Sequence, residues 1–286
     1  PWRQMLTYCV PLIPTAVFWW IMGVSDRYLV KWFVGSDANG IYAVAYKIPT
    51  ILTILATVFM DAWPLSAIAE SGDRRAQARF YARVWDAFFS AVCLCAGGII
   101  AFSPLLIRLL AAESYYDAWR YIPILTLSMI AAAFSNFMGS VYVVTKKSTA
   151  SLWISLAGAA ANIALDLLFV LVLRRGVAGA ALATVIAQGL SAAGIALYFF
   201  FRLPELRPRR SNFRLDRPLL SRIASVSVLT SVQQSIMNFG ILLVQSLVNS
   251  FGVATMAAFA AGVKIDSFAY SPAQDFANGF ATFVAQ

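Results

Sequence analysis

"NIALDLLFVLVLRRGVAGAALATVIAQGLSA" (Asn162–Ala192) contains two long apolar runs that are separated by a short Arg-Arg-Gly turn. The two runs extend beyond these residues, over Ser148–Leu173 and Gly176–Phe201. A helix needs roughly 20 apolar residues to cross the ~30 Å hydrocarbon core of a membrane. The stretch therefore predicts two adjacent transmembrane helices, and the first of them carries a carboxylate, Asp166, in its interior.

The composition of the whole chain agrees with a membrane protein. Of 286 residues, 60% are hydrophobic and 12% are charged, whereas soluble domains carry about 25% charged residues. Apolar alternation at the strand period is absent, which disfavours a membrane β-barrel. We predict an all-α polytopic fold with about eight transmembrane helices. The expected spans are Met5–Phe33, Ala38–Ile68, Trp85–Leu110, Ala118–Val144, Ser148–Leu173, Gly176–Phe201, Leu219–Ser250 and Val253–Val284.

Basic residues in the loops predict how the spans are oriented. Arginines cluster after the second span, lysines follow the fourth, and the long polar connection after the sixth is rich in arginine. By the positive-inside rule these loops, and both ends of the chain, are expected to be cytoplasmic. Arg174 and Arg175 are exceptions. The same connection suggests a division into a six-helix lobe at residues 1–202, a basic linker at 203–218, and the incomplete start of a second lobe at 219–286.

Several classes of function fit the sequence poorly. The net charge of +9 comes from residues that flank spans, so we expect no nucleic-acid partner. The chain has three Cys and no His, and we expect no metal site beyond a possible Na⁺ site. Asp61, Glu70 and Asp73 are too scattered for a catalytic group, and a nucleotide-binding loop is missing. We therefore expect no enzyme activity.

Asp166 is the strongest candidate for a functional residue, because a charge inside a bilayer is costly and usually marks an ion or substrate path. Asn162 lies four residues earlier on the same helix face, Thr184 lies on the next span, and Asp26 lies near the end of the first span. Hard oxygen ligands of this kind suit a proton or Na⁺. The alternative is structural: Asp166 bonds a neighbouring helix, and Asp26 pairs with Arg27 or Lys31.

Two parts of the sequence resemble multidrug and toxic compound extrusion (MATE) transporters. One is the stretch Asn162–Ala192, which is similar to their fifth and sixth spans. The other is "SVQQSIMNFGILLVQSLVNSFGVATMAAFAAGVKIDSFAYSPAQDFANGFATFVAQ" (Ser231–Gln286), which is similar to the start of their second lobe. The resemblance implies a first-lobe cation site built from Asp26, Asn162, Asp166 and Thr184.

The front of the chain, up to about residue 160, resembles polysaccharide flippases instead. The resemblance rests on Pro11–Glu70 and on "SYYDAWRYIPILTLSMIAAAFSNFMGSVYVVTKKS" (Ser114–Ser148). Both families belong to the multidrug/oligosaccharidyl-lipid/polysaccharide (MOP) exporter superfamily, and their patterns meet near Gly158–Asp166. Such exporters are two-lobed and alternate between inward-open and outward-open states.

Two functions remain open from the sequence. The first is H⁺- or Na⁺-coupled antiport that exports organic or drug-like compounds, and the alternative is flipping of a lipid-linked oligosaccharide. The expected partners are membrane lipids and one such substrate, the expected location is a bacterial inner membrane, and no cofactor is expected beyond the coupling ion. Candidates for the substrate cavity are Arg27, Lys47, Gln234, Lys264 and Asp266.

Overall fold

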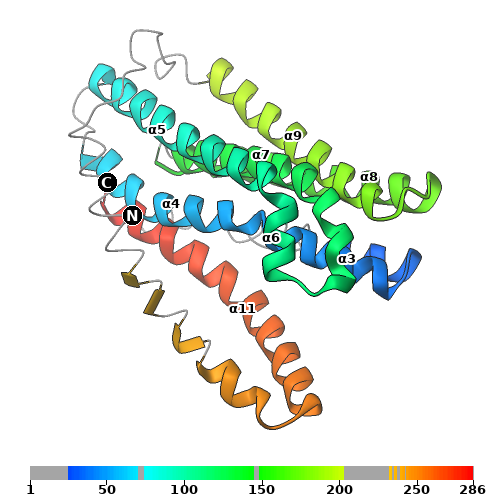
Figure 1. Ribbon diagram of the computed structural model, residues 1–286. Coiled ribbons are helices and arrows are strands. Elements are labelled where there is room, and N and C mark those ends of the chain that lie inside the picture. The colour runs from blue at the N-terminus through cyan, green and yellow to red at the C-terminus, as the bar shows by residue number, and fades with distance from the viewer. Residues whose placement is uncertain are drawn as a thin grey trace.

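A computed structural model describes residues 25–69, 74–144, 148–202, 232–233, 235–236, 239–241 and 243–285. Within these ranges the chain is almost wholly helical and contains no strand (Figure 1). Residues 25–33 form one helical segment. The elements that follow are α3 (Ser36–Lys47), α4 (Thr50–Ala69), α5 (Arg74–Ala101), α6 (Ser103–Leu110), the 3-10 helix η1 (Glu113–Arg120), α7 (Ile122–Val144), α8 (Ser148–Asp166), the π-helix η2 (Leu167–Val172), α9 (Gly176–Arg202) and α11 (Val253–Ala285).

The structure confirms the all-α, multi-pass membrane fold. In the described part of the chain, five helical stretches are long and apolar enough to cross a membrane. The total of eight stays a prediction, because most of the first and seventh expected spans lies outside the described residues. The five stretches are Ser36–Thr57, Arg79–Ala101, Ile122–Tyr142, Leu152–Val172 and Gly176–Arg202.

Two of the expected spans are each divided into two helices next to a proline. The second span changes from α3 to α4 at Ile48–Pro49, and the third changes from α5 to α6 at Phe102, two residues before Pro104. Proline lacks a backbone N–H and clashes with the preceding turn, which interrupts the helix.

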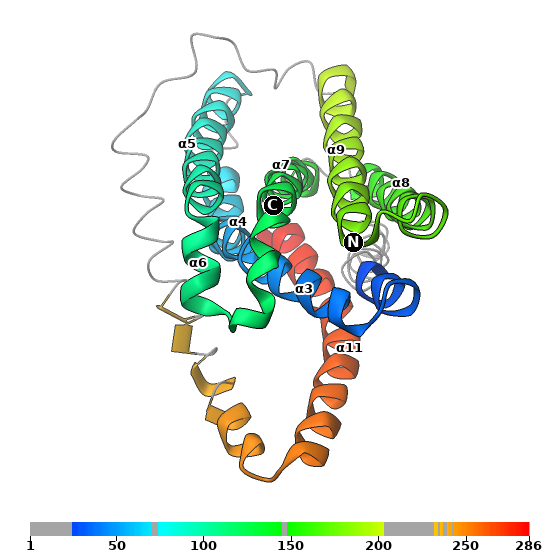
Figure 2. The same cartoon turned by 45° about the vertical axis from the view of Figure 1, so that its right-hand side comes forward.

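α9 packs against both α7 and α8 (Figure 2). Helices in lipid gain little from the hydrophobic effect, so they associate through close packing of small side chains. The buried face of α9 provides such side chains, with Gly179, Ala180, Ala183 and Ala187 among them. This face allows two neighbouring helices to approach closely.

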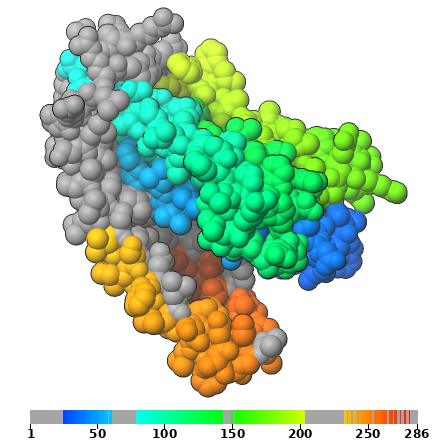
Figure 3. Space-filling model, in the orientation of Figure 1, coloured from blue at the N-terminus to red at the C-terminus, as the bar shows by residue number. Residues whose placement is uncertain are grey.

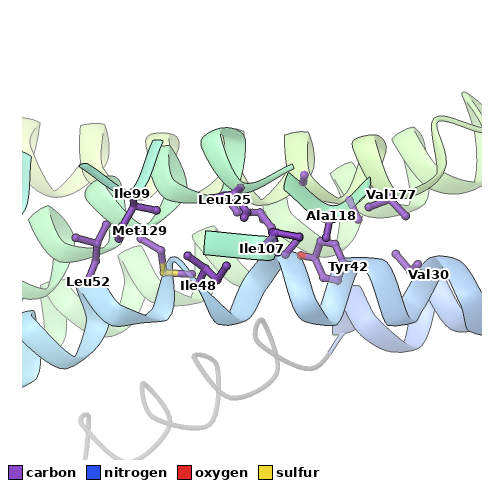
Figure 4. Close-up of a cluster of buried hydrophobic side chains, with 14 of the residues drawn as sticks. Val30, Tyr42, Ile48, Leu52, Ile99, Ile107, Ala118, Leu125, Met129 and Val177 are labelled. Carbon is purple, nitrogen blue, oxygen red and sulfur yellow. The ribbon is translucent and has the colours of Figure 1, made fainter. Parts of the chain in front are cut away.

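Two clusters of buried apolar side chains hold the helices together. One lies at the end of the bundle where α7 and α9 finish and includes Phe88, Phe137 and Phe199. The other lies where these helices begin and includes Val30 and Tyr42. Figure 4 shows the second cluster, in which α3 packs against η1 and the start of α7.

The chain turns between α8 and α9 through an irregular segment. After Asp166 the helix widens into η2, and Arg174 and Gly176 then take positive φ angles of 50° and 58°. Glycine adopts such angles without strain. Three residues later a Cβ at Gly179 would lie 2.9 Å from the carbonyl oxygen of Phe169. Glycines at 176 and 179 thus let η2 fold back tightly onto α9.

α11 confirms the expectation of a helix over Val253–Val284, and it contacts α4 and α7 (Figures 1 and 2). The residues around position 250 extend beyond the rest of the molecule, as the orange region of Figure 3 shows. The division at residues 203–218 lies outside the described residues, so the two-lobe organisation stays a prediction.

Candidate cation site

Asp26 is the centre of a buried polar cluster. Its side chain is only 3% exposed. The Tyr42 hydroxyl on α3 donates a hydrogen bond of 2.7 Å to Oδ2 of Asp26, and Oγ1 of Thr184 on α9 donates a second, also 2.7 Å long. Three helical segments far apart in the sequence therefore meet at one carboxylate oxygen. Asp26 interacts with these hydroxyls where the structural alternative placed a pair with Arg27 or Lys31.

The Thr184 hydroxyl lies near more hydrogen-bond acceptors than it can donate to at once. Its Oγ1 also lies 2.8 Å from the carbonyl oxygen of Ala180 and 3.4 Å from the Tyr42 hydroxyl oxygen. A hydroxyl has a single hydrogen to donate. When that hydrogen points to the carbonyl oxygen of Ala180, the lone pairs of the hydroxyl oxygen are available to the cluster. Thr184 can then serve as an oxygen ligand.

Asp166 is fully buried and ends α8, directly before the π-helix. Neither of its carboxyl oxygens receives a hydrogen bond from the described residues. Asp166 interacts electrostatically with the carboxyl group of Asp26. Two buried carboxylates at short range repel one another unless a proton or a cation lies between them.

Asn162 is also buried, with 1% of its surface exposed. Both its amide oxygen and its amide nitrogen lack a hydrogen-bond partner among the described residues. We expected Asp166 to lie within hydrogen-bonding reach of Asn162 or Thr184. Neither bond is present: both Asp166 oxygens lack a hydrogen-bond partner among the described residues, and the Thr184 hydroxyl bonds Asp26.

The described candidates for the substrate cavity lie apart from the Asp26 hydrogen bonds. The guanidinium group of Arg27 lies 5.4 Å from the ring centroid of Tyr46, in a cation–π contact. Lys47 at the end of α3 and Asp266 on α11 are exposed. Gln234 and the side chain of Lys264 lie outside the described residues.

Two features of the site were missed from the sequence. Tyr42 was not recognised, although a tyrosine hydroxyl in a mainly apolar span is itself a signal, since it must find a partner when buried. The π-helix after Asp166 has no evident sequence signal, because Leu167–Val172 is uniformly apolar. π-helical turns often occur at functional sites.

The chemistry of the donors suits a small cation. Asp26, Asp166, Thr184 and Tyr42 all provide oxygen atoms, which hard cations prefer. Within the described ranges, no three His, Cys, Asp or Glu side chains gather in the way that a multidentate metal site needs. The residues present fit a proton or Na⁺.

A cavity of about 220 Å³ lies elsewhere, between α5, α7 and α9. Aromatic and aliphatic side chains line it, with Trp85, Phe134 and Phe199 among them. Because its walls are apolar, it offers no ligands for an ion. Among the described residues, the carboxyl pair therefore remains the candidate site for an ion.

Comparisons with solved structures place this arrangement among known folds. A crystal structure of a mutant of the MATE transporter VcmN from Vibrio cholerae matches with a TM-score of 0.84 and 19% identity, covering 99% of this chain and 65% of the other. A MOP superfamily transporter from Pyrococcus furiosus matches with a TM-score of 0.77 and 19% identity, covering 97% and 62%. An outward-facing multidrug resistance MATE family transporter matches with a TM-score of 0.77 and 20% identity, covering 97% of this chain and 62% of the other.

No protein-family model and no curated protein matches the chain. The chain spans less than two-thirds of the length of the solved structures that it matches. Nearly all of it aligns with them, so the flippase-like front and the MATE-like remainder form one continuous fold. Over the residues that the structure describes, this chain has the fold of the solved MATE transporters.

Proposed function

We propose that the protein is a cation-coupled antiporter that exports organic, drug-like molecules by alternating access and catalyses no chemical reaction. The observation that carries the proposal is the buried pair of Asp26 and Asp166. Asp166 lacks any hydrogen-bond donor among the described residues, so it needs a proton or a cation to be stable in the bundle. A site that must be neutralised is suited to bind a coupling ion.

The position of the pair suggests how binding is coupled to movement. Asp26 lies on the helical segment of residues 25–33, whereas Asp166 lies where α8 changes into η2. A bound proton or Na⁺ draws the two carboxyl groups together, and its release leaves them to repel one another. The irregular η2 turn is the element that can adjust to this change.

An ion shifts such an equilibrium only by its difference in affinity for the two conformations. Tyr42 and Thr184 provide that difference, because both hydroxyls reach Asp26 only when the segment of residues 25–33 is docked against α3 and α9. We infer that the docked form binds the ion and the separated form releases it.

We place the protein in a bacterial inner membrane with both ends of this segment cytoplasmic, from the loop charges. Membrane lipids are its surroundings and an organic molecule is its cargo. The coupling ion is H⁺ or Na⁺, and we propose no other cofactor. The flippase alternative rests on the front of the chain alone, and that part shares the MATE fold with the rest.

The test is gradient-driven transport by the protein expressed from its complete gene and reconstituted into liposomes. One set of liposomes carries a proton gradient, a second a Na⁺ gradient and a third neither, and each is offered ethidium as a fluorescent organic cation. We expect ethidium transport with one of the gradients. If neither gradient drives ethidium transport, the proposal is contradicted. Movement of a fluorescent lipid-linked oligosaccharide instead would establish the flippase.

A further inference from the structure

The apolar cavity between α5, α7 and α9 has no part in the proposed ion site. α5 and α9 each pack against α7 and lie on either side of it (Figure 2). All three helices line the cavity, which measures about 220 Å³. Its inner wall is buried, with Phe137 1% and Tyr81 5% exposed, whereas the lining residue Phe200 is 49% exposed. The cavity therefore reaches from the interior of the bundle to its surface.

Aromatic rings keep this cavity open. The Trp85 ring meets the Phe134 ring edge to face, with centroids 4.9 Å apart, and its centroid lies 5.2 Å from that of Phe137. Rings that pack against one another in this way have few alternative rotamers. Opposite them, Ala82 on α5 and Ala196 on α9 contribute only methyl groups to the lining. The space is thus preformed, and no single side chain closes it by rotating.

The walls and the size of the cavity indicate what fills it. Its lining is aromatic and aliphatic, so water would gain no hydrogen bonds there. Its volume is below the roughly 300–1,000 Å³ of pockets that bury drug-sized molecules. The surrounding helices are long and apolar enough to cross a membrane, whose hydrocarbon chains are narrow, flexible and abundant. An acyl chain of a membrane lipid therefore fits the cavity better than a drug-sized molecule does.

Arginines lie on the surface side of the cavity. α5 begins at the end of the bundle where α7 and α9 finish, because residues of all three segments form one buried cluster. Arg79 precedes the lining residue Tyr81 by two positions, Arg202 follows Phe200 by two, and both arginines are exposed. At a rise of about 1.5 Å per residue, each lies within one helical turn of the cavity. A lipid whose chain enters the cavity would have its head group near these arginines.

The charge at this end of the bundle selects the kind of head group. Arg83 on α5 adds a third positive charge beside the lining residue Ala82. Within the described parts of α5, α7 and α9 that flank the cavity, Asp86 is the acidic residue, and the three arginines outnumber it. A net positive surface repels an organic cation and attracts a phosphate group. Arginine in particular binds phosphate through paired hydrogen bonds.

We propose that this cavity binds one acyl chain of an anionic phospholipid, whose phosphate is held by Arg79 and Arg202. The bound chain fills the space between α5 and α9, and the head group stays level with those of the surrounding lipids. Basic pockets between transmembrane helices on the cytoplasmic side bind anionic head groups, and the loop charges predict that the Arg202 end of α9 is cytoplasmic. The site does not involve the carboxyl pair, so it is independent of the proposed antiport.

Native mass spectrometry of the protein expressed from its complete gene tests the site. The protein is stripped of lipid in detergent and titrated separately with dioleoylphosphatidylglycerol, dioleoylphosphatidylcholine and glycerol 3-phosphate. We expect one tightly bound phosphatidylglycerol, weaker binding of phosphatidylcholine and no binding of glycerol 3-phosphate. The double variant Arg79→Gln, Arg202→Gln should bind phosphatidylglycerol roughly thirtyfold more weakly, because each basic residue near an anionic group contributes about fivefold. Arg175→Gln, at the other end of α9, is the control and should bind it as the wild type does.

A second pair of variants tests the cavity itself. Ala196→Phe places a ring in the space that the acyl chain would occupy. Ala193→Phe is the matched control, because Ala193 is an exposed alanine on the same helix and does not line the cavity. We expect Ala196→Phe to lose the tightly bound phosphatidylglycerol and Ala193→Phe to retain it. A measurement on the wild type does not depend on the folding of a variant: phosphatidylglycerol with a diazirine at its chain end should label peptides that contain Trp85 or Phe137.

The alternatives give different results. Retention of phosphatidylglycerol by a folded Ala196→Phe variant, or labelling confined to other helices, would overturn the proposal. Equal binding of phosphatidylglycerol and phosphatidylcholine by the wild type would also overturn it, since the arginines would then select no head group. Binding of glycerol 3-phosphate as tight as that of the lipid would assign the arginines to a free phosphate. Displacement of the bound lipid by ethidium would make the cavity a drug site instead.

Discussion

Thr184 donates a hydrogen bond of 2.7 Å to Asp26, although the two residues are 158 positions apart in the chain. This bond ties the helical segment of residues 25–33 to α9, which also packs against α7 and α8. The docking of this helical segment is thereby linked to whether the Asp26 carboxylate is free, protonated or bound to a cation.

Replacing Thr184 by valine keeps the side-chain shape and removes the hydroxyl. We expect about 1 kcal/mol lower stability, from the loss of one buried hydrogen bond, and a clear loss of cation-driven transport. Thr126→Val is the control, because Thr126 is buried on α7 and donates only to the carbonyl oxygen of Ile122, over 2.7 Å. Thermal unfolding in detergent and ethidium transport measure both effects. Equal loss of transport in the two variants would show that Thr184 matters only for packing.

Tyr42 has two roles, which two different substitutions can distinguish. Its ring belongs to the apolar cluster with Val30 and Ala118 (Figure 4), while its hydroxyl donates to Asp26. Tyr42→Phe should cost about 1 kcal/mol and lower transport, because only the hydroxyl is lost. Tyr42→Ala should cost about 3–5 kcal/mol, since it also opens a cavity. A Phe variant with unchanged transport would remove Tyr42 from the site.

Gly158 allows α8 and α9 to approach, and an alanine there should separate them. Overpacking of this kind costs about 1–3 kcal/mol. The double variant Gly158→Ala with Ser191→Ala should recover most of the loss, because the added Cβ would then lie at an ordinary contact distance, 3.4 Å, from the Cβ of residue 191. Gly189→Ala is the control, since no atom lies within 4 Å of a Cβ added there. Failure of the double variant to recover stability would contradict the register of these helices.

The orientation of α9 is testable by cysteine labelling in a background without Cys9, Cys93 and Cys95. Arg175 and Arg202 are exposed and flank the helix. We expect cysteine at position 175 to react with an impermeant maleimide added to intact cells, and cysteine at position 202 to react only after the membrane is opened. The opposite pattern would reverse the predicted topology.

Much of the fold could be predicted from the sequence, because long apolar runs determine where helices cross a membrane. α8 and α9 begin at Ser148 and Gly176, as their apolar runs predicted. Helix breaks were harder to predict, because proline permits a bend without dictating one. Pro49 and Pro104 both coincide with a break, whereas α11 continues through Pro272.

The sequence predicted which residues lie in the site better than it predicted the contacts between them. Asp166 and Asn162 were identified because carboxylates and amides are expensive inside a membrane, and the structure buries both. The hydrogen bonds were not predictable. They depend on how the segment of residues 25–33 docks onto α9, which is a long-range contact without a local pattern. For the same reason Tyr42 was overlooked, and the role of all these residues in ion binding stays a prediction.

The central claim is that Asp26 and Asp166 together hold the coupling ion, and equilibrium binding by the purified protein tests it most directly. The measurements are bound ²²Na⁺ per protein and the number of protons released when ethidium is added, for the wild type and for Asp166→Asn. Asp117→Asn serves as the control, because Asp117 is an exposed partner of Arg120, at 3.5 Å. We predict that Asp166→Asn loses the ion that the wild type binds, while Asp117→Asn retains it. Undiminished ion binding by a folded Asp166→Asn variant would contradict the account.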